Sequence, residues 1–346
     1  MSTRRISGFK PTGPLQLGNY LGAIRPTVQG QDRPTVVFVA DLHALTVPHD
    51  PERLRELTRQ VAGLLLAAGV DPDRTVLYRQ SDLPAHTELH YLLECAAGYG
   101  EVHRMIQFKE KGGGSGTRLS LLTYPVLMAA DILLHDITEV PVGRDQRQHV
   151  ELTRDLALRF NERHGPVLTV PQAVHPQVAA RVADLADPAA KMGKTNASTN
   201  GVLFLLDPPD VLRRKIMRAV TDAGTEVTYD PERKPGVSNL LDLLATCTAR
   251  EPSQIATNYQ SYGQLKSDVA DAVIALLEPI QRRYYELTDA DIEQSLVQGA
   301  EAAAVRADAT VLRVKEAMGL AKKPVTSGRP APADIRATPP TAPGPR

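Results

Sequence analysis

An uninterrupted run of apolar residues near the N-terminus constrains the fold of this chain more than any other feature. The segment 34–40 reads Pro-Thr-Val-Val-Phe-Val-Ala. Such a run is typical of a parallel strand that is buried on both faces. Asp50-Pro51 then predicts a helix start, because aspartate caps a first turn and proline suits the first helical position. Apolar residues fall on one face of this helix, which should end at Gly69.

Further strand-like segments repeat this pattern along the first half of the chain. They lie at 4–9, 74–78 and 138–142, with helix-length segments between them. Alternating strands and helices predict an α/β fold with a doubly wound, Rossmann-type parallel sheet.

The pattern changes near residue 200, where helices replace strands. Helices are expected at 208–221, 237–249, 252–262, 264–287 and 289–318. We therefore predict a Rossmann-type domain over 1–190 with an inserted connective segment at about 80–125, a loop at 191–196 and a helical region over 197–320. Residues 321–346 are rich in proline, and a tail of this composition is expected to be disordered.

Composition narrows the class of protein further. The 346 residues include 40 basic and 40 acidic side chains, which argues against nucleic-acid binding through overall charge but leaves local patches open. Two cysteines, Cys95 and Cys247, are too few for a zinc cluster or a disulfide framework. No apolar run is long enough to cross a bilayer and no secretory signal is recognisable, so a cytoplasmic protein with no membrane association is expected.

Two separated segments indicate nucleotide chemistry. Pro11–Tyr20 reads Pro-Thr-Gly-Pro-Leu-Gln-Leu-Gly-Asn-Tyr, and Lys191–Thr195 reads Lys-Met-Gly-Lys-Thr. The first supplies glycines and a helix start that let the backbone approach a nucleotide. The second places two lysines on a loop, where they can meet a triphosphate. Each segment alone is compatible with ordinary turn residues, but in this order they favour ATP chemistry at the α-phosphate.

Three other segments carry candidate binding residues. Residues 140–146 follow a strand, where ligands bind in open α/β sheets. Asp131 interrupts an apolar helix and shares a face with Tyr124 and Met128. A buried carboxylate needs a donor, which is either a ligand N–H or a neighbouring arginine or backbone N–H. His43 follows the 34–40 strand. The basic run 213–215 is either a solvated face or a contact for RNA phosphates.

The two segments Pro11–Tyr20 and Lys191–Thr195 resemble the HIGH and KMSKS signatures of class I aminoacyl-tRNA synthetases. Longer stretches, Leu121–Asp131, Gln148–Ala157 and Ala219–Leu241, are similar to bacterial tryptophanyl-tRNA synthetases, and the resemblance extends over roughly residues 4–320. It implies an enzyme that joins L-tryptophan to ATP as tryptophanyl-adenylate and transfers it to tRNA(Trp). It also implies a homodimer and Mg²⁺ that arrives with the substrate, with no dedicated metal site in the protein.

The resemblance also assigns the tryptophan site. Asp131 should accept the indole N–H, and Tyr124 and Gln146 should lie near the amino group. The remaining residues of the indole slot would be Ile6, Gly8, His43, Met128, Val140 and Val142.

For the nucleotide, the resemblance implies adenosine binding at Gly18, Asn19, Gly143 and Asp145. Lys111, Lys191 and Lys194 should meet the pyrophosphate. The other residues assigned to ATP binding or catalysis are Lys10, Gln16 and Met192.

The chain departs from the family pattern at several of these positions. Gln16 replaces the first histidine of HIGH, and Lys10 stands where glutamine is common. Arg144 occupies a normally acidic position, and residues 193, 195 and 196 differ from the usual KMSKSD loop. With the complete lack of tryptophan in the chain, these changes are compatible with an accessory, antibiotic-tolerant isozyme, and an ordinary housekeeping role is the alternative.

Three other functions remain open. A tyrosyl-tRNA synthetase shares the fold and the phosphate motifs, but it normally has a larger C-terminal region. A carboxylate adenylyltransferase without tRNA would not need the helical region. A catalytically silent RNA-binding paralogue is disfavoured by Lys111, Lys191, Lys194 and Asp145.

Overall fold

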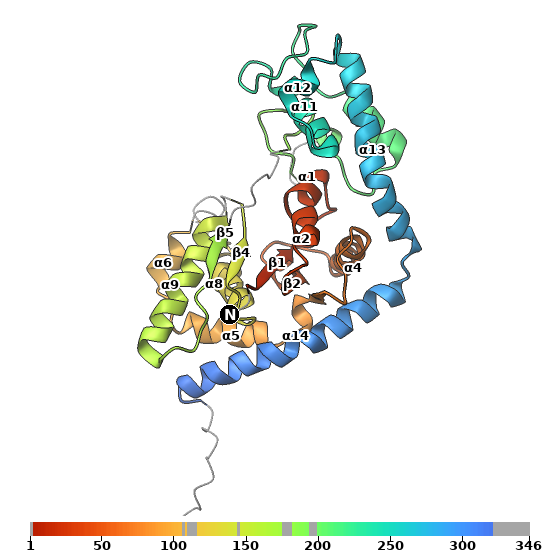
Figure 1. The fold of residues 1–346 in the computed structure, drawn as a ribbon. Helices are drawn as coiled ribbons and strands as arrows, with labels where there is room; N and C mark the ends of the chain where they lie inside the picture. The colour runs from red at the N-terminus through yellow and green to blue at the C-terminus, as the bar shows by residue number, and fades with distance from the viewer. Residues whose placement is uncertain are drawn as a thin grey trace, which may run out of the picture.

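The computed structural model describes residues 3–105, 108, 116–143, 146–174, 182–193 and 199–320. One parallel sheet forms its centre, with the strand order β3-β2-β1-β4-β5. The α/β prediction is thereby confirmed. The strands are β1 Arg5–Phe9, β2 Thr35–Val39, β3 Thr75–Arg79, β4 Glu139–Pro141 and β5 Gln172–Val174. Figure 1 shows the sheet between the helices.

The apolar run of 34–40 forms β2, which pairs along its full length with both neighbours. Val37 is aligned with Ser7 of β1 and Leu77 of β3. Successive side chains point to opposite faces. Val37, Val39 and Leu77 therefore join one buried cluster, and Phe38 and Tyr78 join another on the opposite face.

β1 and β4 share only one aligned pair, Arg5 with Glu139. The Arg5 guanidinium donates to Glu139 Oε2 at 3.0 and 2.8 Å, which holds this end of the pair together. Toward their carboxyl ends the strands are no longer paired. The strand order also reverses direction between β1 and β4, the position at which open α/β sheets bind ligands.

Helices cover both faces of the sheet. In the first half they are α1 Leu17–Asn19, α2 Arg25–Gln29, α3 Asp41–Ala44, α4 Pro51–Ala67, α5 Ala85–Glu94, α6 Tyr99–His103, α8 Leu119–Leu133 and α9 Arg147–His164. A π-helical turn, Tyr20–Ile24, joins α1 to α2, and short 3₁₀ turns lie at Gln80–Asp82 and Thr199–Gly201. Asp50 caps α4 as expected, its side chain accepting from the Arg53 N–H at 2.8 Å.

The second half is helical, as predicted. Its helices are α10 Pro209–Met217, α11 Pro235–Thr248, α12 Pro252–Ala256, α13 Tyr262–Glu286 and α14 Asp289–Ala317. The helix predicted at 252–262 ends early, because the Ser261 side chain accepts from the Gln264 N–H and begins α13 instead.

Helix α14 leaves the helical region and returns to the sheet. In Figure 1 it runs back beneath the sheet, away from α11, α12 and α13, and it packs on β3 and α5. Gly299 allows this approach, because a Cβ there would lie 1.7 Å from the Leu77 carbonyl oxygen.

Two further observations concern the cysteines and the possibility of a membrane-spanning helix. Cys95 and Cys247 are both free thiols. Across the described residues, no helix combines the length and the apolar character needed to cross a membrane.

Candidate active site

A cavity of about 430 Å³ lies at the carboxyl end of β1, beside the unpaired part of β4. Its wall includes Lys10 and Gly143 together with every residue predicted for the tryptophan site. These nine residues are Ile6, Gly8, His43, Tyr124, Met128, Asp131, Val140, Val142 and Gln146. Residues from β1, α3, α8, β4 and the start of α9 thus meet in one place.

Asp131 is the charged group deepest in this wall, with only 2% of its surface exposed. One carboxylate oxygen, Oδ1, accepts from Gln80 Nε2 and from His86 Nδ1, each at 2.7 Å. The other oxygen, Oδ2, accepts from His43 Nε2 at 2.7 Å. Protein donors therefore surround the carboxylate, while it still lines the cavity.

These donors keep Asp131 ionised. Burial works to raise the pKa of its carboxyl, but the charge and hydrogen bonds of His43 and His86 outweigh burial and hold the pKa below its usual range. A buried carboxylate that stays charged is a strong and directional acceptor.

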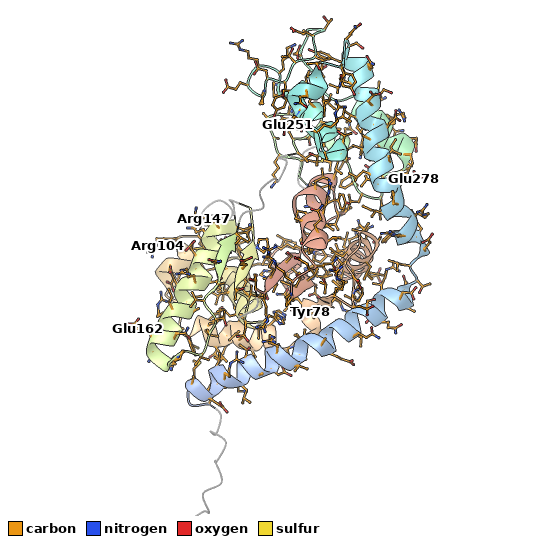
Figure 2. All side chains as sticks on the ribbon, viewed as in Figure 1. Tyr78, Arg104, Arg147, Glu162, Glu251 and Glu278 are labelled. Carbon is orange, nitrogen blue, oxygen red and sulfur yellow. The ribbon has the colours of Figure 1, made fainter. Side chains whose placement is uncertain are left out.

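A second layer of polar side chains lies behind Asp131. The Tyr78 hydroxyl is 2.9 Å from His86 Nε2 and 2.8 Å from His135 Nε2. Tyr78, labelled in Figure 2, comes from β3, the strand on which α14 packs. Burial and the nearby Asp131 charge raise the pKa of the Tyr78 phenol. Burial, with the electrostatic influence of the neighbouring His86, lowers the pKa of His135 to about 3.

The opposite side of the cavity has its own polar group. The Tyr124 hydroxyl is 2.8 Å from His149 Nε2, and Gln146 Oε1 is 3.1 Å from His149 Nδ1. Because the ring Nδ1 must donate to the Gln146 oxygen, Nε2 of a neutral His149 accepts from Tyr124. His149 thus fixes the orientation of both side chains that were predicted to lie near an amino group.

Lys10 and Gly8 enter the cavity wall from β1 and the residue after it. Lys10 Nζ donates to Thr46 Oγ1 at 3.3 Å. A Cβ on Gly8 would lie 2.6 Å from the ring of Phe38, so glycine is required here by the packing of Phe38 inside the protein.

Gln16 joins the first signature segment, Pro11–Tyr20, to Met192 of the second. Its Nε2 donates to the Met192 carbonyl at 2.9 Å, and its Oε1 accepts from the Gly18 N–H at 2.5 Å. Asn19 Oδ1 accepts from the Gln16 N–H at 3.1 Å. Gln16, Gly18, Asn19, Lys191 and Met192 are not among the residues that line the cavity. Lys111, Arg144, Asp145 and Lys194 lie outside the described residues.

The basic run on α10 is largely neutralised. Arg213 forms an ion pair with Asp271, and Lys215 Nζ lies 2.7 Å from Asp207 Oδ2 and 2.7 Å from the Val202 carbonyl oxygen. This pairing favours a structural role for Lys215 over direct contact with RNA phosphates.

Sequence reasoning missed the groups that hold the predicted residues in place, namely Tyr78, Gln80, His86, His135 and His149. A weak signal exists, since Tyr78 is a polar group in an apolar strand and His135 follows the apolar helix α8. Their partners are far apart in sequence, however, and only the fold brings them together.

The parallel sheet, with a cavity where the strand order reverses, places the chain among Rossmann-type α/β proteins, which bind ligands at this position. The family model of class I tRNA synthetases (W and Y) matches residues 2–278, and the chain belongs to this family.

Individual relatives agree. The chain is 53% identical to tryptophan–tRNA ligase 1 of Streptomyces coelicolor, over 94% of this chain and 100% of the relative. It is 46% identical to tryptophan–tRNA ligase of Listeria monocytogenes, over 92% and 98%.

Solved structures are also similar. The crystal structure of tryptophanyl-tRNA synthetase from Mycoplasma pneumoniae aligns with a TM-score of 0.85 and 36% identity, covering 93% of this chain and 98% of the other. The enzyme from Campylobacter jejuni, complexed with ADP and tryptophan, aligns with a TM-score of 0.80 and 31% identity, over 92% and 100%.

Proposed function

We propose that this protein activates L-tryptophan with ATP to form tryptophanyl-adenylate and pyrophosphate, and then transfers the tryptophanyl group to tRNA(Trp). The observation that carries the proposal is the cavity, whose wall combines a buried charged acceptor with apolar side chains. This combination suits a flat aromatic ligand that has one N–H. Membership of the family and relatives named tryptophan–tRNA ligase support the same activity.

In the amino-acid site, Asp131 accepts the indole N–H. Met128, Val140, Val142 and Ile6 pack on the ring, with Gly8 and His43 at the edge. Tyr124 and Gln146, both held by His149, receive the ammonium group. A site built to bond an N–H rejects a ligand that lacks it, because the buried acceptor is left unpaired.

The chemical step needs no general base. The tryptophan carboxylate attacks the α-phosphorus in line, and pyrophosphate leaves with the electron pair of the broken P–O bond. Catalysis then consists of positioning and neutralisation of the charge that develops on pyrophosphate. Lys111, Lys191 and Lys194 perform the neutralisation, and Mg²⁺ enters bound to the phosphates of ATP.

Adenosine is bound by Gly18, Asn19, Gly143 and Asp145, and Lys10 lies between the two substrates. Gln16 contributes through its hydrogen bond to the Met192 carbonyl, which ties the lysine-bearing loop to the nucleotide segment. Residues 1–190 form the catalytic domain and 197–320 bind tRNA. The protein acts in the cytoplasm as a homodimer.

The test is ATP–pyrophosphate exchange with tryptophan, tyrosine and phenylalanine in parallel, followed by charging of tRNA(Trp). Exchange with tryptophan alone and charging of the tRNA are expected. Exchange driven by tyrosine would identify a tyrosyl enzyme. Exchange without charging would identify a tRNA-independent adenylyltransferase.

We further propose that the protein is an accessory, antibiotic-tolerant isozyme. Lys10 on the cavity wall supports this role, because an added cation near the amino-acid carboxylate favours the substrate over analogues without a matching anion. The test compares inhibition by indolmycin of this enzyme and its Lys10→Gln variant. Strong and equal inhibition of both would leave a housekeeping role.

A further inference from the structure

The polar side chains behind Asp131 form one continuous series of hydrogen bonds that ends at His135, beside Ala303 and Arg306 of α14. It runs from the carboxylate through His86 to the Tyr78 hydroxyl and then to His135, with each link between 2.7 and 2.9 Å. His86 and Tyr78 are fully buried and His135 is 1% exposed. None of the three lines the cavity, so none is expected to touch a ligand there.

The number of acceptor sites on Asp131 shows how these hydrogen bonds orient its carboxylate. An ionised carboxylate offers about four lone-pair positions. Oδ1 uses two of them for Gln80 and His86, and Oδ2 uses one for His43. One position on Oδ2 is left for a donor from the cavity. The internal donors therefore determine both the rotation of the carboxylate and the place of its remaining acceptor site.

Gln80 indicates how strongly the fold favours donors to Asp131. Its Nε2 donates to the carboxylate, while its Oε1 is buried and has no hydrogen-bond partner among the described residues. A buried acceptor without a partner is unfavourable, yet this orientation keeps the amide N–H on Asp131.

His86 can orient Asp131 only while its own ring is fixed. Nδ1 must be the donor, because an ionised carboxylate only accepts. The ring is then oriented at Nε2 by the Tyr78 hydroxyl. That hydroxyl has a single proton for two histidine partners, so it donates to one and accepts from the other. His135 thus fixes the rotation of the hydroxyl.

We propose that Tyr78, His86 and His135 are positioning residues that determine specificity for an aromatic ring N–H. They act through Asp131 by keeping its fourth acceptor site aimed into the cavity. This inference rests on the proposed function, since it assumes that the ligand is tryptophan. It predicts that loss of the Tyr78 hydrogen bonds weakens recognition of the ring N–H and leaves ATP binding unchanged.

The experiment compares two substrates, tryptophan and its benzothienyl analogue, in which sulfur replaces the ring N–H. kcat and KM are measured by pyrophosphate exchange for the unmodified enzyme and Tyr78→Phe, which keeps the ring and removes the hydroxyl. The ratio of kcat/KM for tryptophan to that for the analogue should fall about fivefold, the equivalent of one ordinary hydrogen bond. The fall should appear mainly in KM for tryptophan, with KM for ATP unchanged.

His135 provides an independent variant of the same chain. His135→Leu removes one of the two partners of the Tyr78 hydroxyl and should lower the ratio as well, whereas His135→Gln keeps a polar partner and should restore most of it. In Tyr78→Phe/His135→Leu the two effects should not add, because they break one chain. Tyr259→Phe is the matched control. Its hydroxyl bonds Asp268 in the helical region, and its ratio should equal that of the unmodified enzyme.

The result that overturns the inference is a ratio unchanged in both Tyr78→Phe and His135→Leu. An equal loss of kcat/KM for both substrates overturns it as well, because it shows a structural role without selectivity for the ring N–H. Failure of the unmodified enzyme to use tryptophan at all would instead contradict the proposed function. The two failures are therefore distinguishable.

Discussion

Asp131 keeps a full negative charge in a position that water hardly reaches, and this charge is stabilised by its neighbours. Three donors lie at 2.7 Å. The histidines lower the pKa of the carboxyl despite burial. The stability that these hydrogen bonds add to the folded protein is therefore present at neutral pH, and it is lost only as the pH falls through the lowered pKa of Asp131.

Asp131→Asn tests the charge with little change of shape. The amide is a weaker acceptor than the carboxylate, and hydrogen bonds to charged groups contribute about 1.5–3 kcal/mol. We expect kcat/KM for tryptophan to fall about 10- to 100-fold in pyrophosphate exchange, with KM for ATP nearly unchanged. Unaltered discrimination between tryptophan and phenylalanine would show that Asp131 does not read the indole N–H.

Lys191→Ala tests neutralisation of the leaving pyrophosphate. A contact made mainly in the transition state lowers kcat more than it raises KM. We expect this pattern for tryptophan activation in Lys191→Ala and in Lys194→Ala. Full exchange activity in the Lys194 variant would remove the phosphate loop from the mechanism.

His135 makes stability depend on pH in a defined direction. Its pKa falls from 6.5 to about 3 on folding, so the unfolded chain binds a proton that the native protein does not bind. The contribution of the neutral His135 ring to the free energy of unfolding is fully present above pH 6.5. It is lost as the pH falls toward 3, and the loss amounts to about 2 kcal/mol at pH 5. Thermal unfolding at pH 7 and pH 5 should therefore show a smaller drop in Tm for His135→Gln than for the unmodified protein. The exposed His49 supplies the control, since His49→Gln should leave the drop unchanged.

At the scale of elements, the position of α14 on the sheet depends on one missing side chain. Alanine at 299 would place its Cβ 1.7 Å from the Leu77 carbonyl oxygen, which is backbone of β3 and has little freedom to move. Gly263, in the first turn of α13, has no atom within 4 Å of the position that a Cβ would take. Both glycines lie in helices, but only Gly299 lies close to another element, so Gly263 serves as the matched control.

We expect Gly299→Ala to lower the free energy of unfolding by about 1–3 kcal/mol, the usual cost of overpacking. Gly263→Ala should be neutral or slightly stabilising, because alanine favours helix. Denaturant unfolding of both variants measures the difference. Equal stability of the two would mean that α14 does not approach β3 as closely as described.

The sequence was most informative about elements that carry a strong local pattern. The apolar run at 34–40 and the Asp50-Pro51 cap predicted β2 and α4 within a few residues. β5 was missed because its three residues, Gln172–Val174, include no fully buried side chain and so leave no apolar run. The cavity wall could be assigned by resemblance, but the links from Asp131 to Tyr78 and His135 could not, because each hydrogen bond joins separate elements.

At the scale of the whole molecule, the sheet and the helical region share one apolar core. Phe9 and Val37 of the sheet belong to the same buried cluster as Leu240 of α11 and Val273 of α13. Backbone bonds add to it, since the Leu17 N–H donates to the Leu203 carbonyl at 2.8 Å. A shared core couples the unfolding of the parts that build it.

We therefore expect a single heat-absorption peak in calorimetry, with the calorimetric enthalpy equal to the van't Hoff enthalpy. Circular dichroism at helix wavelengths should give the same midpoint as tyrosine absorbance. Two separated peaks would show that the helical region unfolds independently of the sheet.

The cavity has one more consequence for how its ligand can be observed. The chain contains ten tyrosines and no tryptophan, and Tyr124 stands in the cavity wall. Excitation energy absorbed by such tyrosines can be transferred to an indole that lies against them. Excitation at wavelengths longer than the tyrosine absorption band excites the indole alone. Bound tryptophan would therefore be the single indole emitter of the complex, and its emission wavelength and intensity would report the polarity around it without any label on the protein.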